Sequence, residues 1–153
     1  MLEAAYQNGY KTGLVATSRI THATPGSFAA HVVDRDLEAA IAVQETGQYA
    51  LGQNVDLLFG GGKCYFEPNT TAGSCRQDKV DLLKYVRSQD WDLRFDATSL
   101  RAMTAADATK VNLGLFAQGV PPPFVTSKEI IHMLRQGSTC PLRLIVIQTM
   151  NRV

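Results

Sequence analysis

Short apolar runs alternate along the chain with segments in which apolar residues recur at helical spacing. The runs rich in Leu, Val, Ile and Phe predict buried strands. They fall at residues 11–17, 55–62, 93–95, 111–117 and 142–148. The segments with helical spacing predict helices at residues 2–8, 24–32, 37–51, 78–90, 100–107 and 127–136.

Four residues mark the expected ends of these helices. We expect Gly9 to end the first helix, since glycine accepts the left-handed conformation that closes many helices. Thr24 or Ser27 is expected to cap the second helix with its hydroxyl group. Asp78 lies near the expected start of helix 78–90, where the helix dipole favours a negative charge.

Strands and helices thus alternate in steps of roughly 20–30 residues, which is typical of βαβ units. The predicted fold class is α/β: a mostly parallel sheet with helices on both faces. In such sheets ligands bind beyond the carboxyl ends of the strands. Two of these ends carry polar residues or glycines, at Ser18–Thr24 and Gly60–Lys63.

Composition places the chain among globular proteins of one domain. It has 153 residues, 45% apolar and 19% charged, and a net charge of +1 without a basic stripe. The charge distribution argues against nucleic acid as the main partner. No apolar run approaches the ~20 residues of a membrane span, and the start MLEAAYQNGYK has no signal-peptide character. That start reads as the body of a helix, so we expect the chain to begin inside a domain.

Two of the three cysteines bracket a loop rich in turn residues. Cys64 and Cys75 enclose the stretch EPNTTAGS, and Asn69 opens an N-x-T glycosylation sequon within it. A disulfide across this loop would suit an oxidising compartment. Two free thiols and a chance sequon are the alternative, but together the two features favour a secretory-pathway history. Cys140 would then remain unpaired.

The glycine run that follows the second strand matches no nucleotide-binding motif. A phosphate loop needs glycine at position 57 and Ser or Thr after Lys63, where this chain has Leu57 and Cys64. The dinucleotide pattern fails at Tyr65. We interpret the glycines as a sharp turn that lets another backbone approach closely.

The most reactive stretch is SRITHATPGSFAAHVVDR, residues 18–35, directly after the first strand. It contains His22, Thr24, His31 and Arg35. The Arg35 guanidinium matches two phosphate oxygens, the Thr24 hydroxyl is a hard oxygen ligand for magnesium, and His22 could orient a metal-bound water. The alternative is that these residues only cap and solvate a helix. Neither the close Cys or His pairs of a zinc site nor a G-x-S-x-G elbow occurs.

These residues also carry a resemblance to a known family. T-G-L-V-x-T, H-A-T-P and A-H-x-x-x-R recur here with the spacing found in alkaline phosphatases, and VDLLFGGGKCYF resembles the strand of that family that precedes GGG. CYFEPNTTAGSCRQDKVDLLKY is most similar to the fungal branch. The resemblance is clear from about residue 2 to residue 85, continues more loosely through VNLGLFA and fades after about residue 117.

The resemblance implies an α/β enzyme that hydrolyses phosphate monoesters through a phosphoserine, with two zinc ions and one magnesium ion. Carried over by position, Thr24 matches a magnesium ligand and His22 a position next to that metal. Arg35 matches the arginine that grips the substrate phosphate. The resemblance also implies a homodimeric parent in the secretory pathway, at the vacuolar membrane or outside the cell.

Several parts of the family's site have no match in this sequence. The family's D-S-A nucleophile motif and D-x-x-H zinc motif do not occur. The magnesium glutamate expected after strand 142–148 is replaced by Gln148 in IVIQTMNRV. We therefore expect residues 1–117 to be a central, inactive core fragment and residues 118–153 a divergent tail. The rival hypotheses are a non-catalytic α/β anion-binding module and a structural fragment without a ligand.

Overall fold

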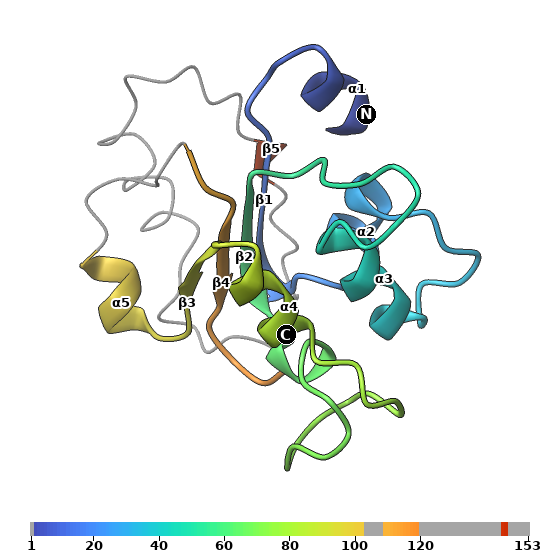
Figure 1. The fold of residues 1–153 in the computed structure, drawn as a ribbon, viewed down its shortest axis with the longest axis vertical. Helices are drawn as coiled ribbons and strands as arrows, with labels where there is room; N and C mark the ends of the chain where they lie inside the picture. Colours follow the sequence, from blue (N-terminus) through green and yellow to red (C-terminus); the bar gives the residue numbers. More distant parts are fainter. Residues whose placement is uncertain (1, 103–108, 120–144, 147–153) are drawn as a thin grey trace.

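The computed structural model describes residues 2–102, 109–119 and 145–146. A five-stranded sheet with the order β3-β4-β2-β1-β5 forms its centre (Figure 1). Its strands are β1 (Gly13–Arg19), β2 (Leu57–Gly61), β3 (Asp92–Arg94), β4 (Asn112–Leu115) and β5 (Ile145–Val146). The chain therefore places β1 and β2 beside each other in the sheet although 37 residues separate them.

Every pairing between the described strands is parallel. Gly13 pairs with Leu57 in β2, and Leu57 pairs in turn with Asn112 in β4. β3 and β5 extend the sheet in the same sense at its two sides. The carboxyl ends of the strands consequently meet at one edge, as the alternating pattern predicts.

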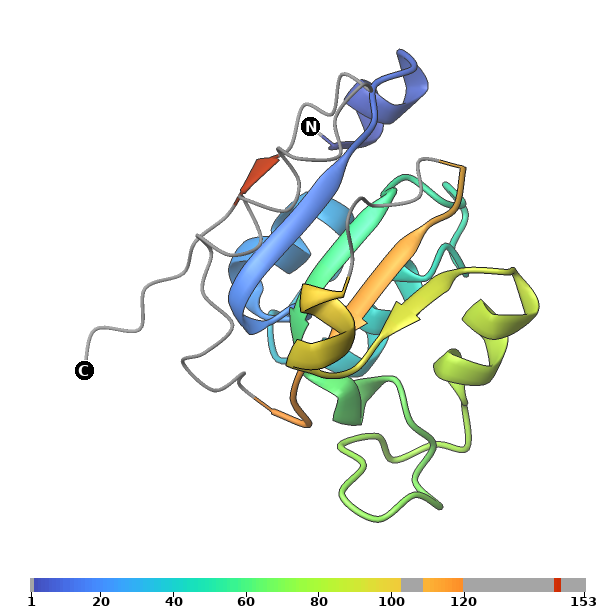
Figure 2. The ribbon, with the colours of Figure 1, turned by 90° about the vertical axis from the view of Figure 1, so that its left-hand side faces the viewer.

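Helices cover both faces of this sheet, so the predicted fold class is confirmed. Figures 1 and 2 show α5 on the side of the sheet opposite α2 and α3. The helices are α1 (Leu2–Gln7), α2 (Ala23–Ala29), α3 (Glu38–Glu45), α4 (Leu82–Ser88) and α5 (Ala97–Arg101), with a 3₁₀ turn η1 (Lys63–Tyr65).

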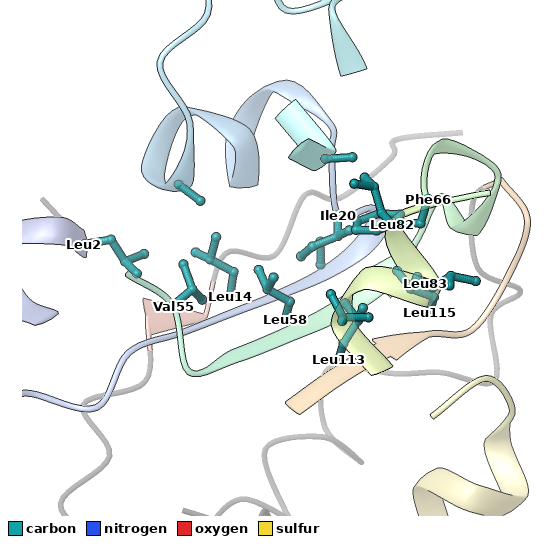
Figure 3. Packing of buried hydrophobic residues seen from close by; sticks show 14 residues of the cluster. Leu2, Leu14, Ile20, Val55, Leu58, Phe66, Leu82, Leu83, Leu113 and Leu115 are labelled. Carbon is teal, nitrogen blue, oxygen red and sulfur yellow. The ribbon is translucent and has the colours of Figure 1, made fainter. Parts of the chain in front are cut away.

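The main core lies between the sheet and the helices α2, α3 and α4. Leu14, Leu58 and Leu113, from three neighbouring strands, are completely buried there with Ile20 and Leu82 (Figure 3). Each such side chain contributes roughly 1.5–3 kcal/mol by leaving water. The core therefore anchors the end of β1, from which the polar stretch 18–35 continues.

The second helix begins earlier than the sequence pattern predicts. His22, in an extended conformation, occupies the N-cap position of α2, so Thr24 and Ser27 lie inside the helix and cap nothing. The helix can begin there because Pro25 falls in the first turn, where its missing N–H has no intrahelical partner to lose. It ends at Ala29, short of the predicted Val32, because Ala30 is extended.

Further helix boundaries also differ from the predictions, among them the start of α5 at Ala97 rather than residue 100. α3 ends at Glu45, six residues short of the predicted end, and Gly47 follows with a positive φ of 76°. α4 begins only at Leu82, because the side chain of Asp81 accepts a hydrogen bond from the Lys84 amide. Asp78, the residue expected near that start, is instead paired with Arg76. Gly9 confirms its expected role, with a φ of 77° directly after α1.

Parts of the predictions fall outside the described residues. They are the helix at 127–136, Cys140, Gln148 and most of the expected tail 118–153. Within the described ranges, no helix is both long enough and apolar enough to cross a membrane.

Candidate functional site

The carboxyl ends of β1 and β2 lie side by side and bring the two predicted polar segments together. The last residue of β1, Arg19, pairs with Gly61 of β2, and the Ile20 amide donates to the Gly61 carbonyl at 3.0 Å. The two strands thus deliver the stretch 18–24 and the glycine run 60–62 to one edge of the sheet.

The glycine run packs directly against the turn that follows β1. A Cβ atom at Gly60 would lie 3.1 Å from the Ile20 amide nitrogen and 3.2 Å from the Ser18 carbonyl oxygen. Gly62 has a φ of 86°, in the left-handed region. The interpretation of these glycines as a turn that admits another backbone is confirmed.

His22 and Arg35 meet at this edge. Arg35 Nη2 lies 3.1 Å from His22 Nε2. Arginine can only donate, so Nε2 accepts and the ring proton belongs on Nδ1. His22 Nδ1 is buried and has no hydrogen-bond partner. A buried polar atom of this kind is uncommon and marks a position where a further polar group fits.

Thr24 stands two residues after His22, in the first turn of α2, and its side chain is exposed. The exposed Arg35 lies in the loop between α2 and α3 and borders a small cavity of about 140 Å³, whose other lining residues include Ala23, Gly26 and Ile41. A larger hollow of about 810 Å³ lies between α3 and the segment 75–78, and His22, Thr24 and Arg35 are not among its lining residues.

His31, the other histidine of the stretch, is not part of this group. Its Nε2 atom lies 2.6 Å from Glu3 Oε1 of α1, and its ring is stacked on Tyr49 with the centroids 6.0 Å apart. The structure therefore divides the reactive stretch: His22 and Arg35 share one contact, whereas His31 ties α1 to the segment after α3.

Sequence reasoning missed a buried ion pair beneath the same turn. Glu38, the first residue of α3, accepts hydrogen bonds from Arg19 Nε at 2.8 Å and from Thr21 Oγ1 at 2.6 Å. Burial alone would raise the pKa of Glu38, but the hydrogen bonds from Arg19 and Thr21 and the charge of Arg19 outweigh it and lower that pKa. No motif marks this pair, because its partners lie 19 residues apart.

The donors at this edge fit part of a magnesium shell. Thr24 offers a hydroxyl oxygen, a ligand type that Mg²⁺ accepts. His22 offers a buried Nδ1–H without a partner, which can donate to an oxygen next to such an ion. Among the residues that the structure describes, no three His, Cys, Asp or Glu side chains gather as a metal site would require. The remaining ligands of such a site would have to come from outside these residues.

The loop after β2 contains the predicted disulfide. Cys64 and Cys75 are bonded, with their Cα atoms 4.9 Å apart, which confirms the expected pairing. Asn69 is exposed within the closed loop, and its side-chain amide donates to the Gln77 carbonyl at 3.0 Å. The sequon is accordingly at the surface.

Comparison with known proteins gives a consistent result. The profile of the alkaline phosphatase family matches residues 1–128. The chain is 53% identical over 90 residues to an alkaline phosphatase of Schizosaccharomyces pombe, covering 59% of this chain and 17% of that protein. It is 40% identical over 131 residues to the repressible alkaline phosphatase of Saccharomyces cerevisiae, covering 80% of this chain and 23% of that protein. The chain thus spans less than a quarter of either curated relative.

Solved structures share the same fold. The alkaline phosphatase of the Antarctic bacterium TAB5 superposes with a TM-score of 0.70 and 27% identity over 97% of this chain and 41% of that one. A histidine mutant of the TAB5 enzyme, described with Mg bound in its M3 site, superposes with a TM-score of 0.68. With the family profile matched over more than half of its length, this chain belongs to the alkaline phosphatase family.

Proposed function

We propose that this chain is part of a phosphate monoester hydrolase and that its β1–α2 turn supplies part of the magnesium and phosphate site. The observation that carries the proposal is the contact between Arg35 and His22 at the carboxyl edge of the sheet, beside an orphaned His22 Nδ1. The family membership and the Mg described in a structural relative support it.

Each of the three residues has a separate role in this proposal. Arg35 is exposed, so its fork can form two parallel hydrogen bonds to phosphate oxygens. The Thr24 hydroxyl would hold magnesium, and His22 would lie next to that ion and orient Arg35 through Nε2. Magnesium, when bound, supplies positive charge that stabilises a phosphoryl oxygen. Zinc would be held by residues other than those described in this chain.

The chemistry of the whole enzyme would use a serine nucleophile and a phosphoserine intermediate. Neither a D-S-A nor a D-x-x-H motif occurs among these 153 residues. A nucleophile, metal positioning and charge stabilisation are needed together for this reaction. We therefore propose that this chain contributes binding groups and is inactive by itself.

We propose that the parent protein passes through the secretory pathway and is located at the vacuolar membrane or outside the cell. The Cys64–Cys75 disulfide supports this, because disulfides persist in oxidising compartments. An exposed Asn69 can accept a glycan in that setting. The parent would act on phosphate monoesters as a homodimer.

The rival hypothesis is an anion-binding module that uses the same turn without any metal. Titration of the full 153-residue chain with inorganic phosphate, with and without Mg²⁺, separates the two hypotheses. We follow the Ala23 and Thr24 amide resonances, and we expect phosphate to bind weakly without Mg²⁺ and about tenfold more tightly with it, a difference of about 1.4 kcal/mol. Arg35→Ala should abolish binding, whereas Arg87→Ala on α4 should not. If phosphate binds equally tightly with and without Mg²⁺, the anion-binding module is supported. If phosphate does not bind to the folded chain at all, the proposal is contradicted.

A further inference from the structure

Glu38 is the most heavily bonded carboxylate near the candidate site, although it belongs to no motif. It is only 6% exposed. Its Oε1 atom accepts from Arg19 Nη2 at 2.6 Å and from the Tyr65 hydroxyl at 3.4 Å. Its Oε2 atom accepts from Arg19 Nε at 2.8 Å and from Thr21 Oγ1 at 2.6 Å. Each oxygen therefore accepts from two residues, and Oε1 also accepts from Arg19 Nε at 3.2 Å.

These partners come from three different parts of the chain. Arg19 is the last residue of β1, Thr21 lies in the turn after it, and Tyr65 ends η1 behind the glycine run. Glu38 itself opens α3. A single buried carboxylate thus joins the end of β1, the glycine turn and the helix that follows Arg35 in sequence.

The two shortest hydrogen bonds of Glu38 come from residues directly before the candidate site. Arg19 and Thr21 lie on either side of Ile20, whose side chain is buried in the core. His22 follows directly, and its amide donates to the Arg19 carbonyl at 3.1 Å. Because the His22 carbonyl accepts from the Gly26 amide at 2.9 Å, the first turn of α2 is fixed through the same residues.

We propose that Glu38 is a positioning residue of the β1–α2 turn. By holding Arg19 and Thr21, it fixes the backbone on which His22 and the magnesium-facing hydroxyl of Thr24 stand. The part concerning magnesium rests on the proposed function, whereas the part concerning the turn does not.

A merely structural ion pair is the alternative. Replacing a buried ion pair is often neutral for stability, so a change in melting temperature cannot decide between the two. The chain offers a matched control in Glu45, the last residue of the same helix. It is 1% exposed, and neither of its oxygens has a hydrogen-bond partner. Glu38→Gln and Glu45→Gln are the same substitution at two buried sites of one helix, only one of which is bonded to the turn.

The first experiment measures amide hydrogen exchange in the metal-free, full-length chain. We expect Glu38→Gln to speed exchange at the His22 and Gly26 amides about tenfold, because local opening of the turn becomes easier. The Asn112 amide, bonded to the Asp56 carbonyl at 2.8 Å near the amino ends of the strands, serves as a reference elsewhere in the sheet and should not change. Glu45→Gln should leave the exchange of the His22 and Gly26 amides within about twofold of the starting chain.

The second experiment follows the Ala23 and Thr24 amide resonances during a titration with Mg²⁺ alone. We expect Glu38→Gln to weaken the apparent Mg²⁺ affinity about fivefold or more and Glu45→Gln to leave it within about twofold. If the starting chain shows no Mg²⁺-dependent shift, the proposed function fails at this site. The exchange experiment then still decides the role of Glu38.

A milder variant covers the case in which Glu38→Gln does not fold. Thr21→Val removes only the hydroxyl bond to Glu38 and leaves the Arg19 pair intact. We expect faster exchange and weaker Mg²⁺ binding in the same direction, but smaller in size. The proposal is overturned if folded Glu38→Gln or Thr21→Val chains match Glu45→Gln in both measurements.

Discussion

Arg35 lies at the surface, where its guanidinium contacts the ring of His22. An exposed arginine of this kind contributes about 0–1 kcal/mol to stability when it forms a salt bridge. Two charge-assisted hydrogen bonds to a phosphate would contribute far more, roughly 1.5–3 kcal/mol each. The geometry therefore favours a ligand-binding role for Arg35.

We predict that Arg35→Ala, in a full-length enzyme that contains this segment, weakens inhibition by inorganic phosphate about ten- to a hundredfold. The melting temperature should hardly move, because the side chain is exposed. Steady-state inhibition and thermal unfolding measure the two effects in parallel. Inhibition within about twofold of the starting enzyme, together with a clear loss of stability, would show that Arg35 is structural.

Glu45 is a second residue whose environment leads to a test. Burial, and to a lesser extent the negative charge of Glu38, raises the pKa of Glu45 well above its ordinary value. The folded chain therefore binds a proton that the unfolded chain releases above a pKa of about 4.3. The stability that this proton provides is complete below about pH 4.3 and is lost as the pH rises toward the folded pKa.

We predict that Glu45→Leu stabilises the chain at neutral pH by about 1–3 kcal/mol, since it removes buried oxygens without partners. The gain should be smaller at pH 5 than at pH 8, because the unfolded carboxyl is more fully ionised at the higher pH. Urea unfolding at both pH values measures this gain in the free energy of unfolding, with Lys84→Ala at the surface as the control. An equal or smaller gain at pH 8 would contradict the raised pKa of Glu45.

At the scale of elements, the loop between η1 and α4 is held mainly by the disulfide and by Arg76. Cys64 and Cys75 are 11 residues apart. The Arg76 side chain, which follows the disulfide, is buried and donates to the Ala39 carbonyl of α3 at 3.0 Å and to the Tyr65 carbonyl at 2.9 Å. Arg76 thus docks this loop on α3, and the disulfide closes the loop at η1.

We predict that reduction of this disulfide destabilises the chain by about 3 kcal/mol, the chain-entropy estimate for a loop of this length. Thermal unfolding with and without dithiothreitol measures the loss. The Cys64→Ser, Cys75→Ser double variant serves as the control, because its unfolding should no longer respond to the reductant. An identical response in both proteins would mean that the reductant acts elsewhere.

At the scale of the whole molecule, the proposed function would need groups beyond those that this chain brings together. The described residues bring a guanidinium, an imidazole and a hydroxyl to one edge of the sheet. The sequence contains no D-S-A or D-x-x-H motif to complete the reaction. We therefore expect this chain to bind phosphate without hydrolysing phosphate monoesters.

We predict no hydrolysis of p-nitrophenyl phosphate by this chain at alkaline pH with zinc and magnesium present. The physical reason is the missing nucleophile, without which charge stabilisation alone has no covalent step to act on. Release of p-nitrophenolate, compared with a blank that contains only the metals, measures the activity. Turnover above that blank which disappears in Arg35→Ala would contradict this prediction.

The periodic pattern of apolar residues predicted the strands and the fold class but not the helix boundaries. Strand cores are set by local runs such as VDLLFGGG, so β2 falls within the predicted range. Helix starts depend on which side chain reaches a free amide, and that choice is made in three dimensions. Asp81 rather than Asp78 caps α4, because Asp78 is held by Arg76.

By itself, the sequence determined the α/β class, the disulfide loop and the family, because runs, cysteine spacing and motifs are local features of the chain. The tertiary structure decided which of the reactive residues meet. It joined His22 to Arg35, turned His31 toward Glu3, and buried Glu38 beneath the turn. These contacts join residues 13 to 28 positions apart along the chain, so only the folded sheet and its helices could bring them together.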